Sequence, residues 1–237
     1  MRAYGSAVLF GTEWSDKVCL KELQGCVDNF EYFQITVNQT GLQEPFDGIL
    51  GMARNEMPVL AGGDPNFFLE NGPIFSDYLA SNNVTSDRRF SFGLGYQEKY
   101  HVDFGPPQVE SMSSEDDLRY VDMYKDFYWS TPGLGFGVGD VSDQNTYAFQ
   151  EDLFTILDTG SSAILLSTDY FMQVVEMILR DYIKTDVYMI DYGAAVMECL
   201  PPSMLPSIYF NVGGWWIEMI GEDYVIDASE FGDRSIC

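Results

Sequence analysis

The stretch FTILDTGSSAILL, residues 154–166, places an acidic turn between two apolar runs. Short apolar runs bounded by turn residues are typical of buried strands, so we predict a strand, a turn and a second strand. An aspartate in such a turn is costly to bury unless its carboxylate accepts hydrogen bonds. The Thr159 hydroxyl and the amides of Gly160 and Ser161 lie within local reach of Asp158. As a bare string, Asp-Thr-Gly is explained more simply by an ordinary Asx turn, but the apolar flanks favour a functional carboxylate.

The rest of the chain shows the pattern of short strands and turns that is typical of β-sheet proteins. Short apolar pieces at residues 7–10, 30–35 and 90–94 are separated by turn residues, and strands resume at residues 208–212. Residues 132–137 carry too many glycines for a helix interior. The sequence therefore predicts a mainly β fold.

A helix and a pair of tryptophans are predicted to contribute to the core. The helix begins near Thr168 and Asp169, which form a capping signal, and apolar residues follow at spacings of three and four. These apolar residues are Phe171, Val174, Val175, Ile178, Leu179 and Tyr182. On a later predicted strand, Trp215 and Trp216 should point to opposite faces, which would put one ring in the core.

The chain is strongly acidic. Its 237 residues include 12 Lys and Arg against 37 Asp and Glu, which gives a formal net charge of -25. This charge opposes binding to phosphate backbones and to anionic lipid surfaces, so nucleic acid is not an expected partner. Repulsion among the carboxylates falls when they are protonated. The composition therefore suits an acidic compartment, or equally a protein that is simply kept soluble by its charge.

Metal-dependent and histidine-dependent chemistry is not expected. His101 is the single histidine, which excludes a zinc site of the HExxH type. Its neighbours place it on a strand, as an ordinary packed or solvent-facing residue. The acidic run Glu115–Asp117 fits a solvated loop, because consecutive acidic side chains point in different directions. We predict no metal site.

The four cysteines are Cys19, Cys26, Cys199 and Cys237, and their spacing is not that of a zinc site. Two disulfides are favoured, and three pairings are open. The shortest loops, Cys19 to Cys26 and Cys199 to Cys237, would put one bridge in each half of the chain.

Two sequons indicate export, although the start of the sequence has no signal-peptide pattern. Asn38 and Asn83 each begin an Asn-X-Thr sequon, which has meaning only in the secretory pathway. No apolar run approaches the roughly 18 residues of a membrane-spanning helix, and the start at Met1 has no signal-peptide pattern. We therefore expect that Met1 is not the natural beginning of the protein.

With apolar runs on both sides of its Asp-Thr-Gly turn, the sequence resembles the pepsin-like aspartic peptidases of eukaryotes. Further segments occur in the same order as in that family. Tyr4-Gly5-Ser6 is similar to the flap hairpin that closes over substrate, and FDGILGMA at residues 46–53 is similar to the apolar-apolar-Gly strand of the first lobe. Tyr128-Trp129 is similar to the strand before the second catalytic turn, and Asp158-Thr159-Gly160 to that turn. The helix after Thr168 and the Cys199/Cys237 pair match the second lobe, so the resemblance covers nearly the whole chain.

The resemblance implies a bilobed aspartic endopeptidase that needs no metal or organic cofactor and in which each lobe supplies one Asp-Thr/Ser-Gly turn. The ionised carboxylate takes a proton from the water that attacks the peptide carbonyl, and the protonated carboxyl donates a hydrogen bond to the carbonyl oxygen. Two close carboxylates do not both ionise easily, which keeps one of them protonated. For a peptide or protein substrate, the resemblance assigns these site residues: catalytic Asp158, the turn residues Thr159, Gly160 and Ser161, and the flap residues Tyr4, Gly5 and Ser6.

The sequence also departs from the family pattern. It contains one Asp-Thr-Gly and no Asp-Ser-Gly, and it starts almost at the flap, whereas the family's first turn lies upstream of the flap. The second lobe's own apolar-apolar-Gly strand would follow Cys237. We therefore expect a fragment, with residues 1–110 as a partial N-terminal lobe and residues 111–237 as a partial C-terminal lobe without its last strands. Alone, this fragment is expected not to hydrolyse peptides, because Asp158 lacks its partner.

Two other interpretations remain open. A noncatalytic aspartic-peptidase-like protein would hold a peptide without cutting it, which fits the single aspartate. A retroviral-type homodimer would form the dyad from Asp158 of two copies, but the flap-bearing first lobe makes a monomer the expectation. The full-length protein is expected to be secreted or lysosomal/vacuolar.

Overall fold

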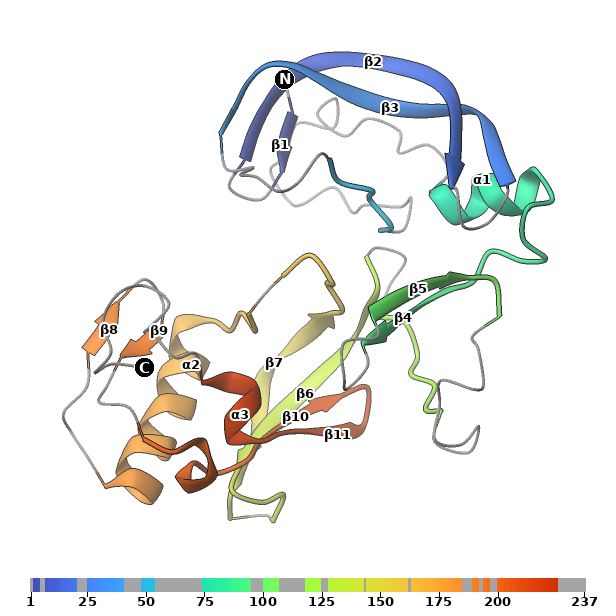
Figure 1. Ribbon diagram of the computed structural model, residues 1–237. Helices are drawn as coiled ribbons and strands as arrows, with labels where there is room; N and C mark the ends of the chain where they lie inside the picture. The colour runs from blue at the N-terminus through green and yellow to red at the C-terminus, as the bar shows by residue number, and fades with distance from the viewer. Residues whose placement is uncertain are drawn as a thin grey trace. The chain divides into compact units, whose positions relative to one another are not determined.

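The computed structural model describes residues 2–4, 7–20, 25–40, 48–53, 74–94, 100–106, 118–124, 128–142, 144–161, 163–184, 189–191, 194–196 and 200–225. These residues form a mainly β structure that divides into two compact units (Figure 1). The first unit comprises residues 1–119 and 126–128, and the second comprises residues 120–125 and 129–237. The predicted lobe boundary after residue 110 stays a prediction.

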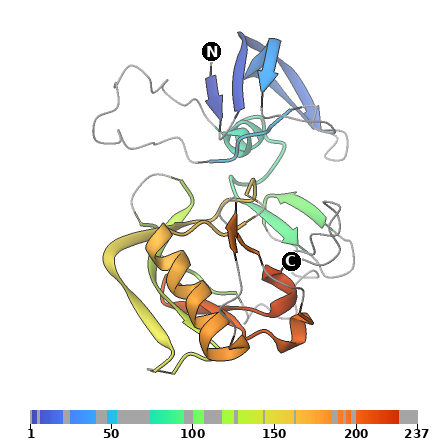
Figure 2. The ribbon, with the colours of Figure 1, turned by 90° about the vertical axis from the view of Figure 1, so that its left-hand side faces the viewer.

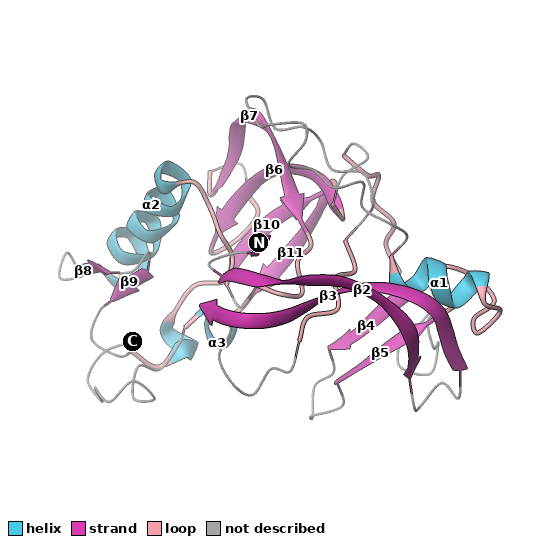
Figure 3. Ribbon diagram, turned by 90° about the horizontal axis from the view of Figure 1, so that it is seen from above, coloured by secondary structure: helices cyan, strands magenta, loops and turns pink. Residues whose placement is uncertain are grey.

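The first unit contains a three-stranded antiparallel sheet of order β1-β2-β3. Strand β1 spans Arg2–Tyr4, β2 spans Ala7–Leu20 and β3 spans Gly25–Thr40. Strands β2 and β3 run side by side as one long curved ribbon (Figure 3). The register places Cys19 opposite Cys26, so the two ends of the short connection between the strands can be joined covalently.

A small core forms where a helix packs under one end of this ribbon. Helix α1 spans Phe75–Ser81, and the hairpin of β4 (Phe90–Leu94) and β5 (Tyr100–Phe104) completes the unit. The Phe75 ring makes edge-to-face contacts with Phe30 of β3 and Phe104 of β5, with ring centroids 5.3 and 5.6 Å apart. One aromatic ring on α1 therefore holds the helix to both sheets of the unit.

The predicted strand at residues 46–53 is wrong for the part that the structure describes. Residues 48–53 form no strand, and the side chains of Ile49 and Leu50 are 48% and 45% exposed. A strand requires a partner for its backbone hydrogen bonds, and none of the described strands pairs with this segment. Met52 packs against the buried cluster of Val27, Phe75 and Leu79. Residues 46 and 47 lie outside the described residues.

The second unit is built on a four-stranded antiparallel sheet of order β11-β10-β6-β7. Strand β6 spans Ser130–Val138, β7 spans Thr146–Ile156, β10 spans Ile208–Val212 and β11 spans Trp215–Met219. The glycine-rich segment thus forms strand β6, in agreement with the predicted absence of helix there. The smaller elements are the strand pair β8 (Met189–Asp191) and β9 (Ala194–Val196), the 3-10 turn η5 (Pro202–Met204) and helix α3 (Gly221–Tyr224).

The register of β6 changes at Leu134. Gly133 lies opposite Leu153 of β7, whereas Gly135 lies opposite Ala148, so one residue of β6 faces four residues of β7. On the other side of β6, the pairing with β10 shifts at the same point, between residues 211 and 212. This irregularity has the character of a β-bulge, which bends a strand and increases its local twist.

The predicted helix is confirmed, with two differences. Helix α2 spans Thr168–Glu176 and continues as the π-helix η4, Met177–Ile183, in one continuous orange helix (Figure 2). The N-cap residue is Ser167, and its side chain makes no capping hydrogen bond, so the predicted capping signal is wrong. Met177, which the predicted stripe omits, is buried. Met177 lies three residues after Val174, a spacing that puts both on one helix face, whereas Tyr182 of the predicted stripe is 40% exposed.

The main core of the second unit lies between this helix and the sheet. Its buried members are Phe136, Val138, Val174, Met177, Ile178, Leu205 and Ile208. The tryptophans of β11 do not join it: the side chains of Trp215 and Trp216 are 47% and 39% exposed, so the prediction of one core ring is wrong. Among the described strands, β11 is an edge strand of its sheet, and four of its five residues are exposed.

Candidate active site

The Asp-Thr-Gly turn follows directly after strand β7. The last strand residue, Ile156, pairs with Ser130 of β6, and the Leu157 amide extends the ladder by donating to the Trp129 carbonyl oxygen at 2.8 Å. Asp158 is thus the first residue beyond the β6–β7 ladder. The strand pair fixes where the turn begins.

Both oxygens of the Asp158 carboxylate accept hydrogen bonds from within the turn. The Gly160 amide donates to Oδ1 at 2.9 Å, and the Ser161 hydroxyl donates to Oδ2 at 2.8 Å. The Ser161 amide donates to the Asp158 carbonyl oxygen at 3.3 Å. Among the described residues, the Thr159 hydroxyl is not a donor to this carboxylate. The predicted set of donors is therefore corrected, with the Ser161 side chain in place of the Thr159 hydroxyl and the Ser161 amide.

A side chain at position 160 would crowd this contact. A Cβ atom on Gly160 would lie 3.1 Å from Asp158 Oδ1, which is tighter than an ordinary van der Waals contact. The bond from the Gly160 amide to a side chain two residues earlier is the Asx turn that the bare motif predicts. The Asp158 side chain is exposed, so water reaches the carboxylate while the two donors orient it.

The apolar segment after the turn is not a strand, which corrects the predicted strand at residues 163–166. Ile164 and Leu165 are 52% and 85% exposed, and Leu166 packs against the core before α2 begins. Apolar composition predicted a strand, but no described strand supplies a hydrogen-bonding partner here. The turn is consequently anchored by β7 on one side and by the start of α2 on the other.

The sequence did not predict a buried polar contact made by a residue of the β6–β7 ladder. Thr131, only 2% exposed, lies opposite Thr155, and its hydroxyl donates to the Asp122 carbonyl oxygen at 2.9 Å. Gly213, with φ of +59°, lies against Thr131, and a side chain at Gly213 would collide with the Thr131 hydroxyl. The Gly213-Gly214 pair is the feature of the sequence that could have indicated this close approach.

Hydrogen bonding and burial perturb titratable groups on the β10–β11 hairpin and α3. Ser207 and Tyr209 both donate to Glu218 Oε1 at 2.7 Å, which lowers the pKa of the Glu218 carboxyl and raises the pKa of Tyr209. Burial raises the pKa of Tyr224 to about 12, and its hydroxyl donates to the Pro206 carbonyl oxygen at 2.6 Å. These hydrogen bonds lie within or beside the four-stranded sheet whose strand β7 leads into the Asp-Thr-Gly turn.

The other predicted residues are distributed over the first unit or lie outside the described residues. Tyr4 ends β1 opposite Ala7 of β2, while Gly5 and Ser6 lie outside the described residues. Asn38 belongs to β3, and Asn83 is exposed after α1. The flap assignment of Tyr4, Gly5 and Ser6 stays a prediction.

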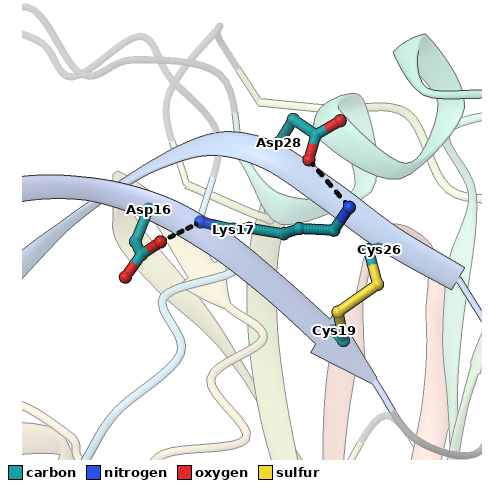
Figure 4. Close-up of a disulfide and its surroundings, with 5 residues drawn as sticks. All are labelled: Asp16, Lys17, Cys19, Cys26 and Asp28. Carbon is teal, nitrogen blue, oxygen red and sulfur yellow. Dashed lines mark hydrogen bonds and ion pairs between the residues drawn. A yellow bond between two sulfur atoms is a disulfide. The ribbon is translucent and has the colours of Figure 1, made fainter.

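A disulfide joins Cys19 and Cys26 across β2 and β3 (Figure 4). Beside it, Lys17 Nζ lies 3.2 Å from Asp28 Oδ1, so a cross-strand ion pair accompanies the bridge. Cys199 and Cys237 lie outside the described residues, and their pairing stays a prediction.

Metal binding and membrane spanning find no support within the described part of the chain. No group of three or more His, Cys, Asp or Glu residues there could hold a metal ion. His101 Nε2 lies 3.3 Å from Asp103 Oδ2 on the same strand. None of the helices in that part is long and apolar enough to cross a membrane.

Two mainly β units with an Asp-Thr-Gly turn at the end of a strand are typical of the aspartic protease class. The chain matches the family described as "Eukaryotic aspartyl protease" over residues 2–237, and it belongs to this family. The fold agrees with the crystal structure of an aspartic proteinase from Irpex lacteus, with a TM-score of 0.69 and 18% identity over 93% of this chain and 62% of that one. The resemblance to the pepsin-like family and the mainly β fold class are therefore confirmed.

Named relatives include proteases of several organisms. Cathepsin D of Clupea harengus is 28% identical over 243 residues, covering 99% of this chain and 54% of that protein. Vacuolar protease A of Neurospora crassa is 25% identical over 235 residues, covering 95% of this chain and 51% of that protein. The chain thus spans about half the length of these relatives.

Proposed function

We propose that Asp158 is one carboxylate of an aspartic endopeptidase dyad and that Gly160 and Ser161 orient it. The observation that carries this proposal is the pair of hydrogen bonds to Oδ1 and Oδ2, made at an exposed turn directly beyond a strand pair. Each carboxylate oxygen has room for about two hydrogen bonds, so one acceptor site on each oxygen remains for water or for a second carboxyl group. The geometry suits a general base that binds a water molecule.

In the proposed reaction, the ionised member of the dyad takes a proton from water while the protonated member donates a hydrogen bond to the peptide carbonyl oxygen. The pair needs two carboxyl groups, because each raises the cost of ionising the other. The sequence contains one Asp-Thr-Gly and no Asp-Ser-Gly. The 237-residue chain alone is therefore proposed to be inactive, and pepstatin-sensitive peptide cleavage by the purified chain would overturn this part of the proposal.

The test of Asp158 begins with the transcript, sequenced from its 5′ end through Met1 for an in-frame Asp-Thr/Ser-Gly turn. In the protein encoded with that turn, Asp158→Asn should lower kcat/KM for an acid-pH peptide substrate by about 10²- to 10⁴-fold, the usual contribution of a general acid or base. Asp169→Asn, an exposed change in the first turn of α2, is the matched control and should leave kcat/KM unchanged. Full activity of Asp158→Asn would contradict the assignment.

The second candidate is a noncatalytic protein that binds peptides, and the single Asp-Thr-Gly favours it. A stop codon or unrelated sequence directly upstream of Met1 would make this candidate the leading one. Calorimetric binding of pepstatin without cleavage would support it further. Under either candidate the partner is a peptide or protein. We propose a monomer that is secreted or lysosomal/vacuolar, and the name of the Neurospora relative is in keeping with a vacuolar location.

A further inference from the structure

The sequon at residues 83–85 lies on a turn that begins where α1 ends. Asn82 is the C-cap residue of α1, and Asn83 follows it with a left-handed φ of 56°. The Asn83 amide donates to the Ala80 carbonyl oxygen at 3.1 Å, so the turn has a defined backbone. Asparagine tolerates this backbone region better than most residues, which gives position 83 a structural reason for its residue type.

The two neighbouring asparagine side chains differ in what they contact. The Asn82 side-chain amide donates to the Tyr78 carbonyl oxygen at 2.9 Å and thereby serves the end of the helix. The Asn83 side chain is exposed, and its amide nitrogen has no hydrogen-bond partner among the residues that the structure describes. Both side chains are exposed, and of the two nitrogens that of Asn83 makes no such hydrogen bond within the described residues.

The other two residues of the sequon are held on the protein side of the turn. Val84 packs against the buried cluster of α1 and β3, and its amide donates to the Leu79 carbonyl oxygen at 2.9 Å. The Thr85 hydroxyl donates to the Asp87 carbonyl oxygen at 2.9 Å. A bulky group on Asn83 would therefore extend into solvent without displacing any core residue.

We propose that Asn83 carries an N-linked glycan. The donor class is an oligosaccharide linked to a polyprenyl pyrophosphate. The Asn83 Nδ2–C1 bond forms as the C1–O bond to the pyrophosphate breaks, one Nδ2 proton is lost, and the polyprenyl pyrophosphate leaves with the electron pair. No oxidation or reduction takes place. This site rests on the export that is part of the proposed function, and it does not depend on catalysis by Asp158.

The test is expression of the full 237-residue chain in eukaryotic cells behind a cleavable secretion signal, with an added C-terminal sequon that reports entry into the secretory pathway. Enzymatic glycan release in heavy-oxygen water converts each glycosylated asparagine to labelled aspartate, which peptide mass spectrometry detects. We expect the label at Asn83. Asn83→Gln and Thr85→Val should each remove one glycan on a gel, whereas Asn82→Gln and Thr85→Ser should keep it.

A chain whose reporter sequon is glycosylated while Asn83 stays unlabelled would overturn the proposal. The assay reads only the sugar attachment, so its result is separate from any measurement of peptidase activity. A labelled Asn83 in the 237-residue chain would leave this site standing, whereas the proposed dyad is tested separately by Asp158→Asn in the protein encoded with the upstream turn.

Discussion

Each oxygen of the Asp158 carboxylate accepts one hydrogen bond from the turn. One of the two donors is a side chain, so mutation can remove it. The Gly160 donor is a backbone amide, whereas the Ser161 donor is a hydroxyl 2.8 Å from Oδ2. The hydroxyl therefore gives a direct way to test positioning separately from chemistry.

Under the proposed function, Ser161→Ala in the protein encoded with the upstream turn should lower kcat by about threefold to tenfold and leave KM nearly unchanged. A hydrogen bond to a charged group is worth about 1.5–3 kcal/mol when buried and less at an exposed site such as this one. Steady-state kinetics on a peptide substrate would measure both constants. Ser161→Thr keeps a hydroxyl and should restore most of kcat, and an equal loss in both variants would show that Ser161 acts through folding.

The sequence predicted the identity of this turn but not its hydrogen bonds. Asp-Thr-Gly between apolar runs was sufficient to locate Asp158, because an Asx turn depends on residues close in sequence. Whether the Thr159 or the Ser161 hydroxyl bonds the carboxylate depends on side-chain rotamers, which the sequence pattern does not encode. Of these two hydroxyls, that of Ser161 bonds the carboxylate.

Among the structural elements, the sheet and helix of the second unit meet around Phe136. Its side chain is fully buried, stacks on Tyr147 with ring centroids 5.4 Å apart and contacts Tyr170 of α2 at 6.5 Å. Loss of this ring would leave a cavity between β6, β7 and α2.

Phe136→Ala should lower the free energy of unfolding by about 3–5 kcal/mol, as large core truncations do. Chemical denaturation followed by tryptophan fluorescence would measure it. Leu134→Ala, at an exposed position of the same strand, is the control and should cost less than about 1 kcal/mol. Equal losses in the two variants would contradict the assignment of Phe136 to the core.

The β10–β11 hairpin should respond to acid through Glu218. The donors Ser207 and Tyr209 hold the Glu218 pKa below its ordinary value of 4.5. A carboxyl group whose folded pKa is lowered stabilises the fold above its unfolded pKa, and this stability is lost as the pH falls through the folded pKa. The contribution of Glu218 is thus complete above about pH 4.5 and disappears below it.

Glu218→Gln keeps an acceptor oxygen and removes the titration, so its Tm should fall less than that of the parent between about pH 5 and pH 2. Thermal unfolding at a series of pH values would show the difference. Ser207→Ala combined with Tyr209→Phe removes both donors and should reduce the fall of Tm at acid pH in the same way. A fall of Tm as steep in Glu218→Gln as in the parent would count against this role.

Elements with a strong local signal were predicted well, and elements that need a distant partner were not. The apolar stripe after Thr168 identified α2, because helical hydrogen bonds are local. Residues 48–53 and 163–166 are as apolar as strands, yet a strand forms only where another strand supplies its ladder. The predicted stripe omitted Met177, although this residue lies three positions after Val174, at an ordinary helical spacing.

Over the whole molecule, the net charge of -25 should make stability depend on salt. At pH 7 the carboxylates repel one another, and raising NaCl from 10 to 150 mM shortens the screening length from about 30 to about 8 Å. We expect Tm to rise by about 2–4 °C, the shift that corresponds to roughly 1 kcal/mol at this chain length. At pH 4, where many carboxylates are protonated, the rise should be smaller, and a salt effect of equal size at both pH values would contradict this explanation.

The change of register at Leu134 separates the two ends of the β6–β7 hairpin. On the side toward Asp158, Ser130–Gly133 pair with Leu153–Ile156, and on the far side Gly135–Gly137 pair with Thr146–Ala148. Because the extra residues of β7 lie between these two ladders, the far loop can lengthen or shorten without shifting the pairs next to the turn. Insertions at residues 139–145 can therefore accumulate during evolution while the geometry of the Asp-Thr-Gly turn is inherited unchanged.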